Sequence, residues 1–209
     1  LATEVRTTKP GKITLKKAPE KYSLAVPKEA RDDFFAGTEY IPESQSVEQI
    51  RSDWIYRFGK EIYDPNGNET GQTGRDQAYL LPDVVGGQEY IDAVQQYARE
   101  TLGESFKGYR LMSLDEFEEL KAGAMGSQLV SFALDPEFAL KFANVARKRK
   151  FGKGERVVVE FPITPEHVQM IGSPTETEVV IDYGVGYNPD EVNGYASPVK
   201  FSLRQEITD

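Results

Sequence analysis

The sequence predicts an α+β fold in which helices come first and strands follow. Two stretches with helical periodicity occupy residues 46–63 and 88–102. From residue 106 onward, short β-branched and aromatic runs alternate with turn residues, a texture typical of strands. Helices and strands that are segregated along the chain favour an α+β domain over a doubly wound sheet.

Each predicted helix has one apolar face. In the first, an apolar residue recurs at every fourth position from Ile50 to Ile62, and residues 46–49 have the form of a capping box. The second follows two glycines and carries Tyr90, Ile91 and Val94 on one face. Neither helix holds a catalytic set, so both are expected to pack against a core.

The chain ahead of these helices differs in charge from the rest. Residues 1–45 contain four prolines and few apolar clusters, which predicts a basic, irregular arm before a domain over residues 46–209. Residues 1–28 carry a net charge of +5, which leaves −14 for residues 29–209. Because phosphate contacts need a basic face, the acidic body argues against nucleic acid as a partner. Within the domain, the helical part is expected over 46–105 and a β-rich catalytic part over 106–209.

Composition excludes several kinds of chemistry. With no cysteine and one histidine, His167, the chain has no thiol nucleophile and no cysteine-based zinc site, and no metal is expected. His167 follows a Thr-Pro-Glu run and is expected in a surface turn. No apolar run approaches the ~20 residues that span a bilayer. The glycine-rich loops of nucleotidases and dehydrogenases are absent too.

Three of the predicted strands carry polar side chains suited to a common site. Strands are expected over 106–112, 128–133, 157–161, 178–181 and 199–203, with a helix over 135–147. Arg110 stands in an apolar strand, where a guanidinium is costly without an anionic partner such as a phosphate. Ser131 could orient a neighbouring side chain. Glu176 and Glu178 precede a β-branched run, and strand alternation predicts both on one side, where they repel unless a cation or a reaction uses them.

This order resembles the mono-ADP-ribosyltransferases of the R-S-E class, a group of bacterial toxins, effectors and ecto-enzymes that use NAD. The matching blocks are residues 108–110, 129–143 and 176–181. The middle block is the most specific, because it follows a Ser strand with the pattern D-P-x-x-A-x-x-F-A. The last block matches the E-x-E motif of the class. Spacing agrees as well, with 21 residues from Arg110 to Ser131 and 47 from Ser131 to Glu178.

The resemblance implies a role for each matched residue. Glu178 would be the catalytic carboxylate, and Ser131 would hydrogen-bond it and fix its rotamer. Glu176 would meet an acceptor arginine, since two glutamates in this motif are typical of arginine-modifying members. Arg110 would contact the NAD phosphates, with Tyr109 beside it in the NAD site.

A basic segment over residues 147–154 corresponds to the loop that lies over NAD in this class. In it, Arg149 would face the pyrophosphate and Phe151 would stack on the nicotinamide; a solvated basic loop is an equal reading. One departure is Ala133, which stands where the class has a hydroxyl.

The resemblance implies helices packed on two antiparallel β-layers that form an NAD cleft. The implied function is metal-independent mono-ADP-ribosylation of a target protein, with NAD as substrate. An NAD glycohydrolase, with water as acceptor, and a degenerate binding module of the same fold are the alternatives. Because the class includes secreted toxins, delivery into a host or competitor cell is one expectation for location.

Overall fold

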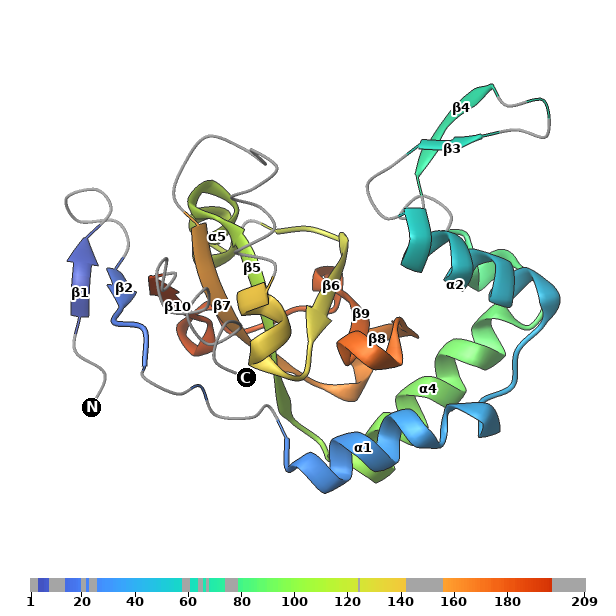
Figure 1. The fold of residues 1–209 in the computed structure, drawn as a ribbon, viewed down its shortest axis with the longest axis horizontal. Helices are drawn as coiled ribbons and strands as arrows, with labels where there is room; N and C mark the ends of the chain where they lie inside the picture. The colour runs from blue at the N-terminus through green and yellow to red at the C-terminus, as the bar shows by residue number, and fades with distance from the viewer. Residues whose placement is uncertain are drawn as a thin grey trace, which may run out of the picture.

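The computed structural model describes residues 4–7, 14–19, 22, 26–57, 61–63, 66, 68–73, 79–123, 125–141 and 156–196. These ranges form a mixed α+β protein, as predicted (Figure 1). The helices are α1 (Lys28–Ala36), α2 (Gln45–Arg57), α4 (Gly87–Leu102) and α5 (Leu114–Lys121). Another helical segment begins at residue 136 and is described as far as 141.

Eight of the described strands form one sheet. Its order is β1 (Glu4–Thr7), β2 (Thr14–Lys16), β10 (Asn193–Ala196), β7 (Arg156–Ile163), β5 (Phe106–Ser113), β6 (Leu129–Ala133), β9 (Glu178–Asp182) and β8 (Val168–Ile171). The pairs are antiparallel except β2 with β10. Strands β3 (Glu61–Tyr63) and β4 (Glu69–Thr73) form a separate hairpin.

The joint between β5 and β6 is one residue pair wide, as is the joint between β2 and β10. β5 pairs with β7 over all eight of its residues, and β6 pairs with β9 over all five of its own, but β5 and β6 meet only at Tyr109 and Ala133. At this joint the eight-stranded sheet divides into two parts, one that ends at β5 and an antiparallel one formed by β6, β9 and β8. The three strands with the predicted site residues, β5, β6 and β9, are neighbours there.

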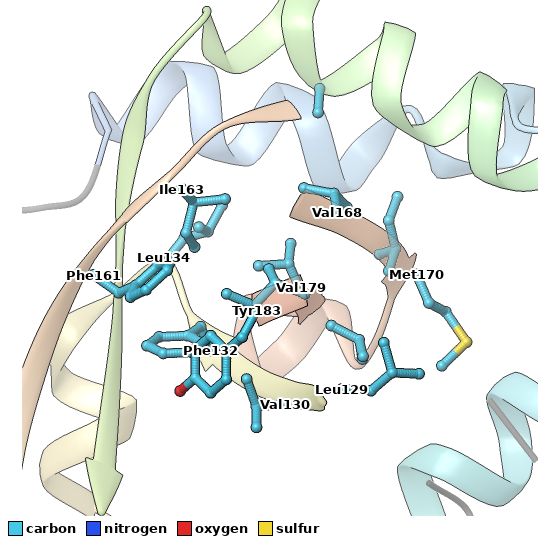
Figure 2. Packing of buried hydrophobic residues seen from close by; sticks show 14 of the residues in the cluster. Leu129, Val130, Phe132, Leu134, Phe161, Ile163, Val168, Met170, Val179 and Tyr183 are labelled. Atoms are coloured by element: carbon cyan, nitrogen blue, oxygen red, sulfur yellow. The ribbon is translucent and has the colours of Figure 1, made fainter. Parts of the chain in front are cut away.

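The core closes over this joint. A Cβ added to Gly108 of β5 would lie 3.0 Å from the Cβ of Phe132 in β6 and 2.5 Å from Ile163 in β7. Only a glycine allows such an approach, because a side chain needs that space. Phe132 and Phe161 lie with ring centroids 5.4 Å apart, and Tyr183 packs on both (Figure 2). Phe132 thus belongs to the core, as alternation from Ser131 predicts.

Helix α4 joins the helical part to the sheet, and its predicted apolar face is confirmed. Tyr90, Ile91 and Val94 are buried. The Tyr90 hydroxyl accepts a hydrogen bond from the amide of Ile171 in β8 at 3.2 Å. Along the same helix, Tyr97 stacks on Phe34 of α1 at a centroid distance of 5.2 Å, and Figure 1 shows α1 and α4 side by side.

The prediction of an irregular arm over residues 1–45 is wrong for its second half. Helix α1 lies there and buries Phe34 completely. Nearer the N-terminus, Leu15 of β2 is also completely buried. Helix α1, which directly follows Pro27, is short and has only two or three apolar positions, so its helical periodicity is weak in the sequence.

The first predicted helix is displaced at both ends. It begins at Gln45, because Ser44 caps it by accepting from the amide of Val47 at 3.2 Å. It ends at Arg57, and residues 61–63, predicted as helix, form β3. The predicted strand over 199–203 and the end of the helix over 135–147 lie outside the described residues.

Candidate active site

Glu178, the first residue of β9, has a carboxylate held by hydrogen bonds at both oxygens. The hydroxyl of Ser131 donates to Oε2 at 2.5 Å, and the amide of Ser173 donates to Oε1 at 3.0 Å. The register explains the first contact: Ser131 pairs with Val180, so Glu178 is its diagonal neighbour on the same face. Because each oxygen accepts a hydrogen bond, the orientation of the Glu178 carboxylate is restricted.

Gly172 supplies the floor beneath this carboxylate. A Cβ added to Gly172 would lie 1.8 Å from Glu178 Oε1 and 2.4 Å from Cδ. Backbone bonds lock the two segments together, because Gly172 N donates to the carbonyl of Glu178 and Glu178 N donates to that of Ser173, both at 3.0 Å. The Glu178 side chain therefore folds back over a position where any larger residue would displace it.

The environment of Glu178 raises its pKa above the ordinary value. Burial is the main cause, and the nearby charge of Glu176 adds to it, while the bonds from Ser131 and Ser173 and the charge of Arg110 act in the opposite direction. Across the strand pair, the residue directly opposite Glu178 is Ala133, which offers no polar atom to it. The carboxylate is thus both fixed and poorly solvated.

Glu178→Gln is expected to stabilise the folded protein at neutral pH. The folded state holds this proton to a higher pH than the unfolded chain, so stability falls as pH rises from 4.5, the ordinary value, through the folded-state pKa. A glutamine keeps the shape without that cost. Thermal unfolding from pH 4 to 8 should give the variant a higher Tm at pH 7, with the gap closing toward pH 4. A difference in Tm between the variant and wild type that stayed the same from pH 4 to pH 8 would contradict the raised pKa.

Arg110 reaches the same region from β5. Its Nη1 donates to the carbonyl of Ser131 at 3.4 Å, so the guanidinium spans the narrow joint between β5 and β6. Its Nε lies 3.4 Å from Glu116 Oε1, and both side chains are largely buried, at 19% and 23% exposure. This arrangement holds a cation beside the strands of Ser131 and Glu178.

Glu116, the partner of Arg110, lies at the start of α5 and is largely buried. It lies in the first turn of α5, where its amide donates to the hydroxyl of Ser113 at 3.2 Å. The Ser113-x-x-Glu116 spacing is that of a capping box, and this was the signal in the sequence for a helix start next to Arg110. Capping fixes Glu116 where it can pair with the guanidinium.

Glu176 does not share the strand of Glu178, so the alternation that predicted a common side does not apply. It ends a 3₁₀ turn over Pro174–Glu176, and β9 begins only at Glu178. Thr177, between them, has φ of 49° and ψ of 39°, which is left-handed backbone. Glu176 is half-buried, and its charge still contributes to the raised pKa of Glu178. The two carboxylates therefore interact electrostatically although they do not share a strand.

Tyr109, another predicted site residue, is not brought to this group. Tyr109 points to the opposite face of β5 from Arg110, where it is buried and its hydroxyl donates to Glu160 Oε2 at 2.9 Å. Because successive side chains of a strand point to opposite faces, the sequence could have predicted that Tyr109 and Arg110 lie on different faces of β5. Arg149 and Phe151 lie outside the described residues.

His167 is buried, not in a surface turn. Its Nδ1 lies 2.8 Å from the Thr164 hydroxyl and its Nε2 lies 2.6 Å from the carbonyl of Gly186. Burial lowers the pKa of His167 despite these partners. The ring is therefore a structural link between two turns.

Elsewhere in the described part of the chain there is a hollow, but it lies away from these side chains. A hollow of about 390 Å³ near the start of α2 is lined by Gln45, Ser46, Gln49, Ile50 and Val84, none of which is a predicted site residue. Within the described ranges, no cluster of three or more His, Asp or Glu side chains could hold a metal ion, and no helix is long and apolar enough to cross a bilayer. The candidate site is therefore identified from the arrangement of Arg110, Ser131 and Glu178, and not from a cavity or a metal cluster.

Comparison with known proteins gave no match: no family model, no curated protein and no solved structure is significantly similar to this chain.

Proposed function

We propose that this protein is an NAD-dependent mono-ADP-ribosyltransferase that modifies arginine in a target protein. The observation that carries the proposal is the Glu178 carboxylate, held by Ser131 and Ser173 beside the cation of Arg110. These are the residues of the R-S-E pattern, and they come together from three neighbouring strands. A chance match of motifs in the sequence would not require such a meeting.

The proposed fold follows from the same site. The narrow joint between β5 and β6 divides the sheet into two parts, which would correspond to the two β-layers of the class. NAD would lie along this joint, with its phosphates toward Arg110 and its nicotinamide ribose toward Glu178. A guanidinium suits phosphate because its planar fork donates two parallel hydrogen bonds.

In the proposed reaction, the bond between ribose C1 and the nicotinamide nitrogen breaks, and its electron pair leaves with neutral nicotinamide. Positive charge develops on the ribose, where a fixed carboxylate stabilises it. Glu178 would accept a hydrogen bond from the ribose 2′-hydroxyl and supply that charge. A guanidine nitrogen of the acceptor then forms the new bond to C1 and loses a proton, which Glu176 would accept.

The experiment that tests the proposal uses NAD labelled in its adenylate part, with a cell lysate as the source of acceptors. A transferase releases nicotinamide and labels protein. A glycohydrolase releases nicotinamide and labels none, and a binding module does neither. Mapping the modified residue in the labelled protein distinguishes arginine from other acceptor residues.

Gly172→Ala is expected to lower NAD cleavage about 100-fold, because the new Cβ displaces the Glu178 carboxylate and misplacement of a catalytic group by ~1 Å has an effect of this size. Initial rates of nicotinamide release measure it. The matched control is Gly126→Ala, where an added Cβ would have no atom within 4 Å apart from those of the adjacent residues in the chain. If Gly172→Ala folded and cleaved NAD at the control's rate, the position of Glu178 would not matter to the reaction.

A further inference from the structure

Thr177, the residue between the two glutamates, has a backbone conformation that its side chain disfavours. Among the described residues it is the one non-glycine residue with positive φ, at 49°. A β-branched side chain crowds the backbone in this left-handed region, so the conformation persists only where other contacts hold it. Thr177 is also buried, at 7% exposure. Its surroundings must therefore determine the turn.

The contacts that hold Thr177 come from the chain directly after β6. The amide of Asp135 donates to Thr177 Oγ1 at 3.0 Å, and the amide of Leu134 donates to the Thr177 carbonyl at 2.9 Å. Two consecutive amides that follow the strand of Ser131 thus end on this one residue. The side-chain bond needs a hydroxyl, and the left-handed backbone directs the carbonyl to the other amide.

Asp135 in turn connects this turn to the N-terminal helix α1. Its Oδ2 accepts from Arg31 Nη1 at 2.9 Å, and the two side chains are 15% and 10% exposed. Its Oδ1 accepts from the amide of Glu137 at 2.9 Å, at the start of the next helix. The ion pair fixes Asp135, and its amide then fixes Thr177, so three segments far apart in sequence meet at the turn.

The left-handed turn also decides where Glu176 lies. With ordinary β backbone at residue 177, β9 would begin earlier in the chain. Glu176 would then be part of the strand, on the same face as Glu178. In the structure, residues 174–176 instead form a 3₁₀ turn that leaves the line of the strand. Glu178 keeps its own bonds to Ser131 and Ser173 and does not depend on Thr177 Oγ1.

We propose that Thr177 is a positioning residue that selects the acceptor. Its turn, held by the Asp135 amide and through Asp135 by Arg31, places Glu176 to receive the acceptor guanidinium while Glu178 carries out NAD cleavage. This inference rests on the proposed transferase function. Loss of the Thr177 hydroxyl should therefore separate transfer from hydrolysis, because the former needs both glutamates and the latter needs one.

The test compares three variants at this position. Thr177→Ser keeps the hydroxyl, Thr177→Val keeps the shape without it, and Thr177→Gly removes the hydroxyl but adopts the left-handed backbone freely. For Val and Gly, the ratio of arginine transfer to NAD hydrolysis should fall about tenfold, the effect of one lost hydrogen bond. The loss should appear as a higher KM for the acceptor, with hydrolysis near the wild-type rate. Ser should keep the wild-type ratio.

Amide hydrogen exchange at Asp135 gives a readout that needs no activity. It should be faster in Val and Gly than in Ser and wild type, because the acceptor of that amide has gone. If Val and Gly kept the transfer ratio, or lost both activities in parallel with Tm, the positioning role would be overturned. If wild type did not cleave NAD, the proposed function would fail, and unchanged exchange in Val and Gly would separately show that Thr177 does not hold the turn.

Discussion

Glu178→Gln is expected to lower NAD cleavage about 10³-fold, for both hydrolysis and transfer, because it removes the charge that stabilises the developing positive ribose. Glutamine can retain the geometry: its oxygen can accept from the Ser173 amide and its amide can donate to the Ser131 hydroxyl, which rotates freely. Nicotinamide release under saturating NAD measures the effect.

The matched control for this substitution is Glu119→Gln on α5, which changes an exposed glutamate. It should leave the rate within about twofold of wild type, as surface substitutions ordinarily do. If Glu178→Gln also unfolds at a higher temperature than wild type at pH 7, as expected, a low rate is not explained by misfolding. Normal cleavage by a folded Glu178→Gln protein would contradict the proposed role of this carboxylate.

Glu176→Gln is expected to lower transfer to arginine about 100-fold while NAD hydrolysis stays within about threefold of wild type. The size is that of a lost general base, together with the lost pairing between carboxylate and guanidinium. Glu178 retains its bonds to Ser131 and Ser173 in this variant, so NAD cleavage should continue with water as acceptor.

The measurement for Glu176→Gln records nicotinamide release and modified arginine in the same reaction, with a small arginine derivative as acceptor. Glu119→Gln again provides the control for a neutralised glutamate. A parallel fall of both products would place Glu176 in NAD cleavage itself, and an unchanged ratio would remove it from acceptor recognition.

The strands that carry the site could be predicted from sequence because each is a short, locally encoded run. The β-branched residues after Glu178 predicted β9, and alternation correctly placed Phe132 in the core, opposite Ser131. The meeting of Arg110, Ser131 and Glu178 depends on strand order, which the residues alone do not encode locally. For that step the resemblance to a known class supplied the expectation.

The features that sequence reasoning missed depend on long-range contacts. Thr177 has no intrinsic preference for left-handed backbone, and the amides of Leu134 and Asp135, in the segment after β6, hold it there. Strand alternation therefore failed at Glu176. The short helix α1 was missed because contacts remote in the chain help to bury its residues: Phe34 stacks on Tyr97, and Arg31 pairs with Asp135.

The proposed role of Glu178 in cleaving NAD for transfer to arginine is tested most directly by one reaction. Purified protein is incubated with NAD and a small arginine derivative, and mass spectrometry follows nicotinamide and the ADP-ribosylated derivative together. We expect both products to form in wild type and both to form about 10³-fold more slowly in Glu178→Gln. Equal formation of both products by wild type and Glu178→Gln, or no nicotinamide release by wild type, would contradict it.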